Sequence, residues 1–394
     1  MSWRSLLLLA LVAVLGSGCQ PLPPQQGVVL WTGVTDQERA VLVSLGQRFE
    51  HDTGVPVKVQ AVPFDDLRVK YQIAAPAGLG PDIVTGPNDW VGTLATAHLI
   101  QPLSEADFGD KRAFMPTAVE AVSFAGACYG YPYSLETLAL IYNLKLIPKP
   151  PDTFPALLAV ARELKHDDQY GLLFWVDKFY YAWPFFSGYG ATVFSPAGGI
   201  PTVALDSPAA VQAGHLIVDM HELMFPGVDE TFARQLFGQG KVGCILDGPW
   251  VLGDVSGHFP LQVQPLPPLG PGLVPKPFVS VQSFMLNPRS THHDEAIRFL
   301  HYVETRDNLL QLTDASGRVP ARRDSLAARQ DKPALVAFAR QAEQGVPMPN
   351  VPALNAVWPP FDDALKLILS GANVEQTLHQ AVEQTNLDIR QMME

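Results

Sequence analysis

Several aromatic side chains of this sequence stand beside polar ones, and this pairing is the pattern with the clearest chemical meaning. Flat apolar rings cover the C–H faces of a sugar, while neighbouring acceptors bind its hydroxyl groups. The sequence therefore predicts a carbohydrate-binding site. Its candidate residues are Asp89, Trp90, Glu136, Tyr180, Trp250 and Trp358. Any one of these tryptophans, taken alone, is better explained by a hydrophobic core, and it is their number at strand ends and in Pro-rich loops that favours a site.

Common catalytic motifs are missing from the sequence. There is no Walker A sequence, no Gly-x-Ser-x-Gly motif and no His-Glu-x-x-His motif, because His221-Glu222 lacks the second histidine. We predict no cofactor and no metal site. A glycoside hydrolase is the enzymatic alternative, since Asp89 and Glu136 could form a carboxylate pair roughly 5 to 9.5 Å apart.

Glu136 lies in the stretch that we expect to join two halves of the fold. Residues 129–143 have the pattern of a strand, a short polar break and a second strand buried on both faces. A carboxylate at such a joint is costly unless it is solvated or paired. We therefore predict two lobes that meet at residues 134–137 beside a wet cleft. The alternative is a loop glutamate that faces bulk water.

The segment before this joint alternates strands with helices. Thr35 and Glu38 form a capping box for a helix that ends at Gly54, and Asp65 or Asp66 is expected to cap the next one. The expected strands are residues 28–31, 55–59 and a third that begins at Pro81. Ligands of doubly wound sheets lie at the carboxyl ends of the strands, which here include residues 85–90.

A second unit of strands and helices follows the joint. Helices are expected at residues 154–165, 207–224 and 232–237, strands at 172–175, 242–246 and 278–287, and mostly helices from His293 onward. Pro249 at the first position of a helix would place Trp250 in the first turn, facing the strand ends. Trp358 falls in a Pro-rich interruption at residues 347–360.

Composition limits the number of domains and the class of partner. A chain of 394 residues suggests roughly two domains. The net charge is −12, and the lysines and arginines are scattered rather than clustered. Because nucleic acid is held by neutralising its phosphates, we do not expect it as a partner.

Residues 1–19 have the features of a secretory signal. Arg4 precedes an apolar run of about ten residues, which is too short to span a bilayer as a helix. The run Leu15–Cys19 resembles a bacterial lipobox, with Gly16 at a position that usually carries leucine. We predict lipidation of Cys19 and a tether over residues 20–27. Secretion without a lipid anchor is the alternative.

Two further cysteines, Cys128 and Cys244, lie in apolar strand patterns. Buried thiols are the main interpretation and a disulfide the lesser one.

The chain resembles the maltose/maltodextrin-binding proteins, the extracellular solute-binding proteins (family 1) of bacterial ABC importers, over nearly its whole mature length. The segments that carry the resemblance are Phe49–Val55, Gly80–Ile83, Tyr131–Pro132, Leu140–Asn143, Trp183–Pro184, Gly248–Trp250, Lys276–Val279 and Pro347–Pro352. Their order and spacing match throughout.

The resemblance implies an α/β protein with the periplasmic-binding-protein type II fold, in which a hinge joins two α/β lobes and the ligand cleft lies between them. The N-terminal lobe would comprise residues 28–135 and 280–317, and the C-terminal lobe residues 136–279 and 318–394. Three crossovers are expected, at residues 134–138, 278–283 and about 316–320. Asp89 and Glu136 would bind sugar hydroxyls, and Tyr180, Trp250 and Trp358 would form a stacking wall.

Several polar positions depart from the family. Gly86 stands where the family has a cleft tryptophan, Trp90 replaces an arginine and Lys178 replaces a glutamate. Maltose, maltodextrin, trehalose or a related glucoside are therefore all expected ligands.

The resemblance also implies a non-enzymatic monomer on the outer face of the cytoplasmic membrane. Its partners would be the permease subunits and separate ATPase of an ABC importer. A sensor module that signals to a membrane receptor is a further alternative.

Overall fold

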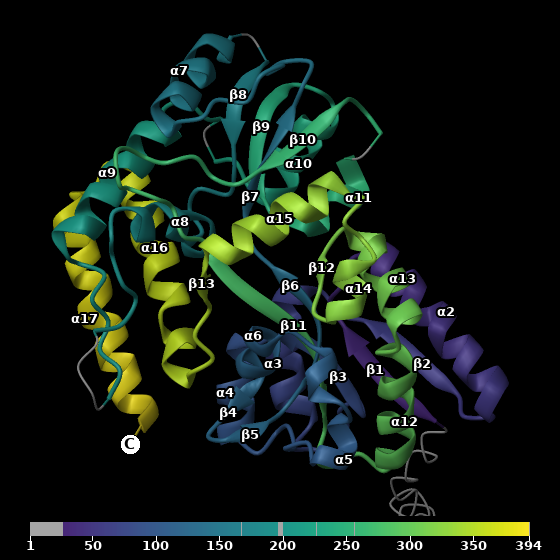
Figure 1. The fold of residues 1–394 in the computed structure, drawn as a ribbon. Coiled ribbons are helices and arrows are strands. Elements are labelled where there is room, and N and C mark those ends of the chain that lie inside the picture. The colour runs from purple at the N-terminus through teal and green to yellow at the C-terminus, as the bar shows by residue number, and fades with distance from the viewer. Residues whose placement is uncertain (1–26, 167, 196–199, 226, 256, 394) are drawn as a thin grey trace, which may run out of the picture.

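The computed structural model describes residues 27–166, 168–195, 200–225, 227–255 and 257–393. The expected signal segment, Cys19 and most of the tether lie outside this part of the chain. Within the described residues, no helix is both long enough and apolar enough to span a bilayer. The same residues contain no group of His, Cys, Asp and Glu side chains that could hold a metal ion. The chain forms two α/β lobes, one in the lower and one in the upper part of Figure 1.

The first lobe is built on a mixed seven-stranded sheet. Its strands in spatial order are β12 (Val319–Pro320), β6 (Tyr131–Glu136), β11 (Phe278–Leu286), β3 (Ile83–Pro87), β1 (Val28–Thr32) and β2 (Val57–Ala61), with β13 (Val346–Pro347) paired to β11. β1 runs parallel to β2 and β3, whereas β11 is antiparallel to both of its neighbours β3 and β6. Because β11 comes late in the chain, distant segments meet at the centre of this lobe.

Helices and a small hairpin surround this sheet. They are α2 (Asp36–Thr53), α3 (Phe64–Ala74), α4 (Asp89–Thr96), α5 (Glu105–Phe108), η1 (Lys111–Ala113), α6 (Pro116–Ala121), α12 (His293–Val303), α13 (Arg306–Ser316), α14 (Arg323–Ala327), and the paired strands β4 (Ser123–Phe124) and β5 (Ala127–Cys128). The Thr35–Glu38 capping box and the left-handed Gly54 at the end of α2 are confirmed.

The expected cap of α3 is wrong. The helix begins at Phe64 with Pro63 at the N-cap position, and no side chain caps it. Asp65 and Asp66 instead occupy the first turn, where carboxylates interact favourably with the positive end of the helix dipole. The sequence shows acidic residues at a helix start in either case, so it does not distinguish a capping aspartate from one in the first turn.

The second lobe contains a four-stranded sheet. Its order is β10 (Leu261–Gln264), β7 (Ala139–Asn143), β9 (Val242–Asp247) and β8 (Tyr170–Leu173). The associated helices are α7 (Phe154–Leu164), α8 (Phe179–Gly188), α9 (Pro208–His221), α10 (Glu230–Gly238), η2 (Pro249–Val251), α11 (Leu252–Val255), α15 (Pro333–Gln344), α16 (Trp358–Leu369) and α17 (Val374–Met393). A short helix, η3 (Pro352–Ala356), precedes α16 and contacts α4 of the first lobe.

The strand pairings show where the chain passes between the sheets. β6 belongs to the first sheet and β7 to the second, with only residues 137–138 between them. β12 pairs with β6, so Val319 and Pro320 lie in the first sheet. The expected boundary at residue 318 places them in the C-terminal lobe instead. We therefore propose that the third crossover follows β12.

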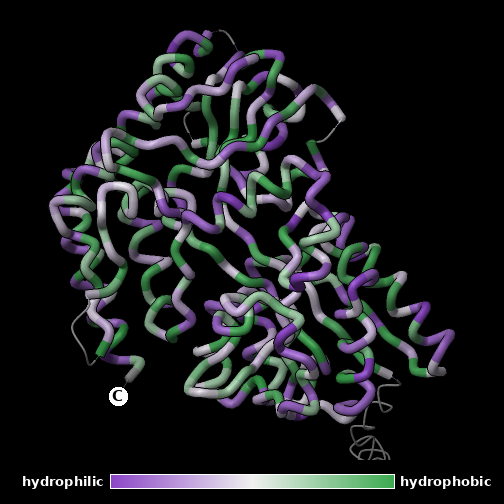
Figure 2. Tube along the Cα trace, viewed as in Figure 1, coloured by the Kyte–Doolittle hydropathy of each residue, from purple (hydrophilic) through white to green (hydrophobic). Residues whose placement is uncertain are grey.

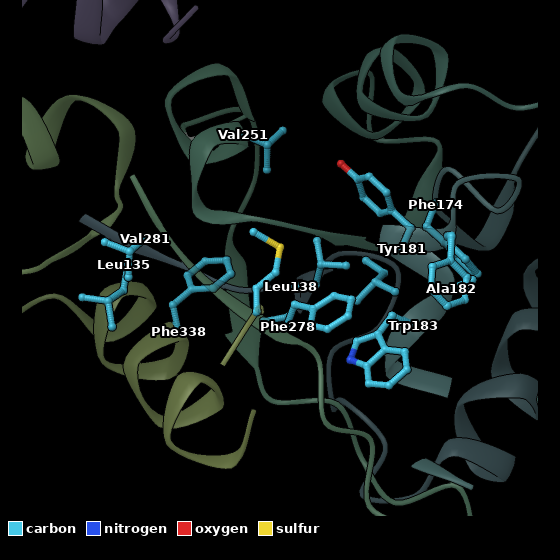
Figure 3. Close-up of a cluster of buried hydrophobic side chains, with 14 of the residues drawn as sticks. Leu135, Leu138, Phe174, Tyr181, Ala182, Trp183, Val251, Phe278, Val281 and Phe338 are labelled. Carbon is cyan, nitrogen blue, oxygen red and sulfur yellow. The ribbon is translucent and has the colours of Figure 1, made fainter. Parts of the chain in front are cut away.

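The buried core is continuous across the junction of the lobes. In Figure 3, Leu138 and Phe278 lie between Leu135 and Phe338 on one side and Trp183 on the other. Trp183 and Phe278 stack with ring centroids 4.6 Å apart and an interplanar angle of 8°. Figure 2 shows hydrophobic segments along the strands inside both lobes. This core fixes the base of the cleft, on which the site is built.

Both described cysteines are free and buried, as predicted. Cys128 lies on β5 of the first lobe and Cys244 on β9 of the second. Each thiol donates to a backbone carbonyl, that of Gly130 and that of Gly171 respectively. Burial raises the pKa of both thiols. Neither thiol is therefore a reactive group.

Candidate functional site

A cavity of about 570 Å³ lies between the two lobes. Its lining comes from the loop after β1, from β3, β6 and β11, and from α3, α4, α8, α10, η2, η3 and α16. The structure brings all six predicted site residues to this one cavity: Asp89, Trp90, Glu136, Tyr180, Trp250 and Trp358. Residues separated by more than 250 positions in sequence therefore share one site.

Asp89 is the first residue of α4 and is 6% exposed. Burial raises the pKa of its carboxyl from 3.8 to about 6, and the opposing effects of nearby Arg68 and of a hydrogen bond with the Trp358 side chain are smaller. Its Oδ1 is buried and has no hydrogen-bond partner among the described residues. Asp89 thus contributes to the cavity lining a carboxyl group with one oxygen that no described residue pairs.

Glu136 ends β6 and is also 6% exposed. Its Oε2 accepts hydrogen bonds from Gln282 Nε2 at 3.1 Å and from Ser280 Oγ at 3.4 Å, both on β11. Its other oxygen pairs with Arg318. The interpretation as a loop residue facing bulk water is wrong, because Glu136 is paired within a strand end.

Arg318 joins three parts of the fold at the base of the cavity. Its guanidinium pairs with Glu136 and, at 2.7 Å, with Glu38 of α2, and all three side chains are almost fully buried. The guanidinium carbon also lies 5.7 Å from the centre of the Trp250 ring. The charge thus connects the first-lobe helix, the hinge strand and the second-lobe aromatic residue.

Three aromatic residues of the second lobe line the cavity. Tyr180 lies in the first turn of α8, Trp250 in η2 after Pro249, and Trp358 at the start of α16. All three are half-buried. Trp358 packs against Phe278, with ring centroids 6.0 Å apart and an interplanar angle of 85°. The Trp358 ring is therefore supported by Phe278, and all three residues line the cavity.

Trp90 differs from these three residues in being buried beneath another aromatic ring. It is 6% exposed and stacks on Phe64 of α3, with centroids 5.5 Å apart and an interplanar angle of 29°. The indole occupies the space above Gly86, where an added Cβ would lie 2.3 Å from Trp90 Cε3. Phe64, which sequence reasoning missed, is 46% exposed and lines the cavity.

The sequence also failed to identify the ionic lining of the cavity. Lys178 Nζ lies 2.8 Å from Asp362, while Arg234 pairs with Asp247 at 2.8 Å and with Glu230. Burial raises the pKa of Glu230 and of Asp362. The Lys178–Asp362 and Arg234–Asp247 pairs join different elements, so local spacing gives no signal for them, whereas Glu230 and Arg234 are four residues apart on α10.

Two α/β lobes with a polar and aromatic cavity between them, joined where strands cross from one sheet to the other, define a hinged solute-binding protein. Residues 34–308 match the family described as bacterial extracellular solute-binding protein. The chain belongs to this family, and the resemblance noted from its sequence is confirmed.

The names of several relatives refer to oligosaccharides. The chain is 27% identical to the maltotriose-binding protein of Pyrococcus abyssi, over 91% of this chain and 81% of the relative. It is 28% identical to the galactooligosaccharide-binding protein of Bacillus subtilis, over 85% and 83% respectively. The solved structure of the Thermus thermophilus maltotriose binding protein bound with maltotriose superimposes with a TM-score of 0.85 at 30% identity, covering 92% of this chain and all of that one.

Proposed function

We propose that this protein captures a maltooligosaccharide in its cleft and delivers it to an ABC importer. The observation that carries the proposal is the cavity in which the aromatic wall of Tyr180, Trp250 and Trp358 shares a lining with the buried carboxylates Asp89 and Glu136. Rings bind the apolar faces of a sugar and carboxylates accept hydrogen bonds from its hydroxyls. The relatives named for maltotriose support the choice of an α-glucan.

The ionic lining favours a neutral ligand. Among the described residues, four cationic side chains line the cavity: Arg68, Lys178, Arg234 and Arg318. The last three are paired with carboxylates, and Arg68 bonds the Asn355 side chain close to Asp89. A phosphate or carboxylate ligand would have to displace one of these partners, and it would also meet the neighbouring acidic groups. A sugar without charge meets neither obstacle.

The proposed mechanism is closure of the two lobes about the strand crossovers. Asp89 begins α4 and Glu136 ends β6, both in the first lobe, and the aromatic wall comes from the second lobe. A sugar that contacts both sets gains its full interaction energy only when the lobes approach each other. The ligand shifts the equilibrium toward the closed form by this difference in affinity, and the closed form is what the permease would recognise.

The protein would act as a lipid-anchored monomer outside the cytoplasmic membrane, with Cys19 as the lipidated residue and residues 20–27 as the tether. Permease subunits and a separate ATPase would complete the importer. Membership of an extracellular family and the lipobox-like run before Cys19 support this arrangement. We propose no enzymatic activity, because the relatives are named as binding proteins.

The test is a calorimetric titration of the purified mature protein with maltose, maltotriose, maltotetraose, trehalose and a galactooligosaccharide. We expect the tightest binding with a maltooligosaccharide and no release of shorter sugars above a control without protein. Tighter binding of the galactooligosaccharide would overturn the choice of ligand. Time-dependent hydrolysis would instead favour a glycoside hydrolase.

A further inference from the structure

Phe64 is an exposed aromatic residue at the edge of the cavity. It comes from the first lobe, whereas the aromatic wall comes from the second. It is the first residue of α3 in the first lobe and is 46% exposed, whereas Asp89 and Glu136 are each 6% exposed. Phe64 therefore lies at the rim of the cavity and the carboxylates lie deeper. A large apolar ring left in water beside a binding cavity is a surface that a ligand can cover.

The ring of Phe64 has a rigid support. It stacks on the buried indole of Trp90, and that indole in turn lies directly on the backbone of Gly86. An added Cβ at Gly86 would come within 2.3 Å of the indole, so only glycine leaves room for this stack. At the other side of Phe64, a Cβ on Gly33 would lie 2.9 Å from the Phe64 Cα, so the start of α3 is also closely held.

The second lobe repeats this construction. Trp250 lies over Gly248, where an added Cβ would come within 2.1 Å of the indole ring. Trp250 lines the cavity from the second lobe, as Phe64 does from the first. In each lobe, an aromatic ring at the cavity thus depends on a glycine that leaves room for an indole. In the second lobe that ring is the indole of Trp250, and in the first lobe it is Phe64, which stacks on the indole of Trp90.

We propose that Phe64, supported by Trp90 on Gly86, is a stacking platform for an outer ring of the oligosaccharide and sets the preference for chain length. A short sugar held at the deep carboxylates leaves the rim ring uncovered, and a longer one reaches it. This inference rests on the proposed sugar-binding function and adds a specificity-determining residue to it.

The test compares Phe64→Ala and Phe64→Tyr with the wild type, using calorimetry with maltose, maltotriose and maltotetraose. Phe64→Ala should raise the Kd of the longest sugar by roughly tenfold, because most of one ring face is lost, and should change that of maltose by less than about twofold. Phe64→Tyr keeps the ring and should restore the preference for longer sugars. Gly86→Ala should weaken the longer sugars in the same direction as Phe64→Ala, because the new methyl group displaces the indole.

Phe225→Ala is the matched control. Phe225 is 38% exposed and packs on Phe232 with centroids 4.9 Å apart, but it lies outside the lining of the cavity. It should leave all three affinities unchanged. If the wild type binds maltotriose and maltotetraose and Phe64→Ala binds both as tightly, the platform is refuted while the proposed function stands. An equal loss for maltose and maltotetraose would refute the chain-length role. A wild type that binds none of these sugars would refute the proposed function itself.

Discussion

The buried carboxyl of Asp89 should make sugar binding weaken in mild acid. Burial raises the pKa of this group to about 6, and its Oδ1 is without a protein partner among the described residues. A sugar hydroxyl donates best to the ionised form. With a pKa of about 6, roughly nine tenths of the unliganded protein carries the charge at pH 7 and roughly one tenth at pH 5. The Kd should therefore rise about tenfold between these two pH values.

The effect on stability has the opposite sign. Because the folded-state pKa of Asp89 lies above its ordinary value of 3.8, its contribution to stability is fully present below about pH 4 and is lost as the pH rises through 6. Protonation of Asp89 thus weakens binding without destabilising the empty protein. Affinity and melting temperature can be separated on this basis.

Asp89→Asn isolates this carboxyl from other acidic groups near the cavity, such as Glu230. The amide keeps the shape but gives a neutral acceptor, and hydrogen bonds to charged groups contribute about 1.5 to 3 kcal/mol. We expect a Kd roughly ten- to a hundredfold above that of the wild type at pH 7 and little change down to pH 5. The assay is calorimetry with the best sugar at pH 5, 6 and 7 for both proteins. A wild-type affinity that is constant over this range, or an Asp89→Asn variant with the same tenfold fall, would refute the reasoning.

Three further predictions concern the ionic base of the cavity, the thiols and the anchor. Arg318→Met leaves two buried carboxylates without their cation and should cost about 3 to 5 kcal/mol of unfolding free energy, measured by denaturant titration. Arg112→Met, at an exposed ion pair, should leave the unfolding free energy almost unchanged, and equal effects of the two variants would contradict the role of Arg318. Cys128 and Cys244 should both react with a thiol reagent in denatured, non-reduced protein, and a count of zero would contradict their separation into different lobes. Cys19→Ala should release the protein from the membrane fraction or block its processing with sugar affinity unchanged, and unaltered membrane partitioning would refute the anchor.

The elements that the sequence predicted well are those with local signals. The Thr35 capping box, the strand after it and the glycine at the helix end depend only on neighbouring residues. The joint near Glu136 was predictable in outline, because two buried strands follow each other closely, but the predicted break at residues 134–137 is wrong: β6 continues through Glu136 and the break is at residues 137–138. The six site residues came from aromatic and polar side chains at such strand ends and loops.

The parts that the sequence did not predict depend on contacts between distant segments. Arg318 is 182 positions from Glu136 and 280 from Glu38, so no local pattern shows that they form one ionic cluster. Nothing in the sequence around Trp90 indicates that its ring is buried beneath Phe64 and not exposed to the cavity. The indole of Trp90 lies over Gly86, the position at which the resembling family carries a tryptophan. That the Trp90 ring occupies this space is visible only in the folded structure.

The most direct test of the account is the affinity of the two second-lobe tryptophan variants for the best sugar. Trp250 and Trp358 should each place an apolar face of order 100 Å² on a sugar ring. At about 25 cal/mol per Å², its loss costs on the order of 2 kcal/mol. We predict that Trp250→Ala and Trp358→Ala each raise the Kd by roughly ten- to a hundredfold while the empty proteins keep melting temperatures close to that of the wild type. Wild-type affinity in both variants, or unfolding of both, which is the behaviour of core tryptophans, would contradict the sugar-stacking wall.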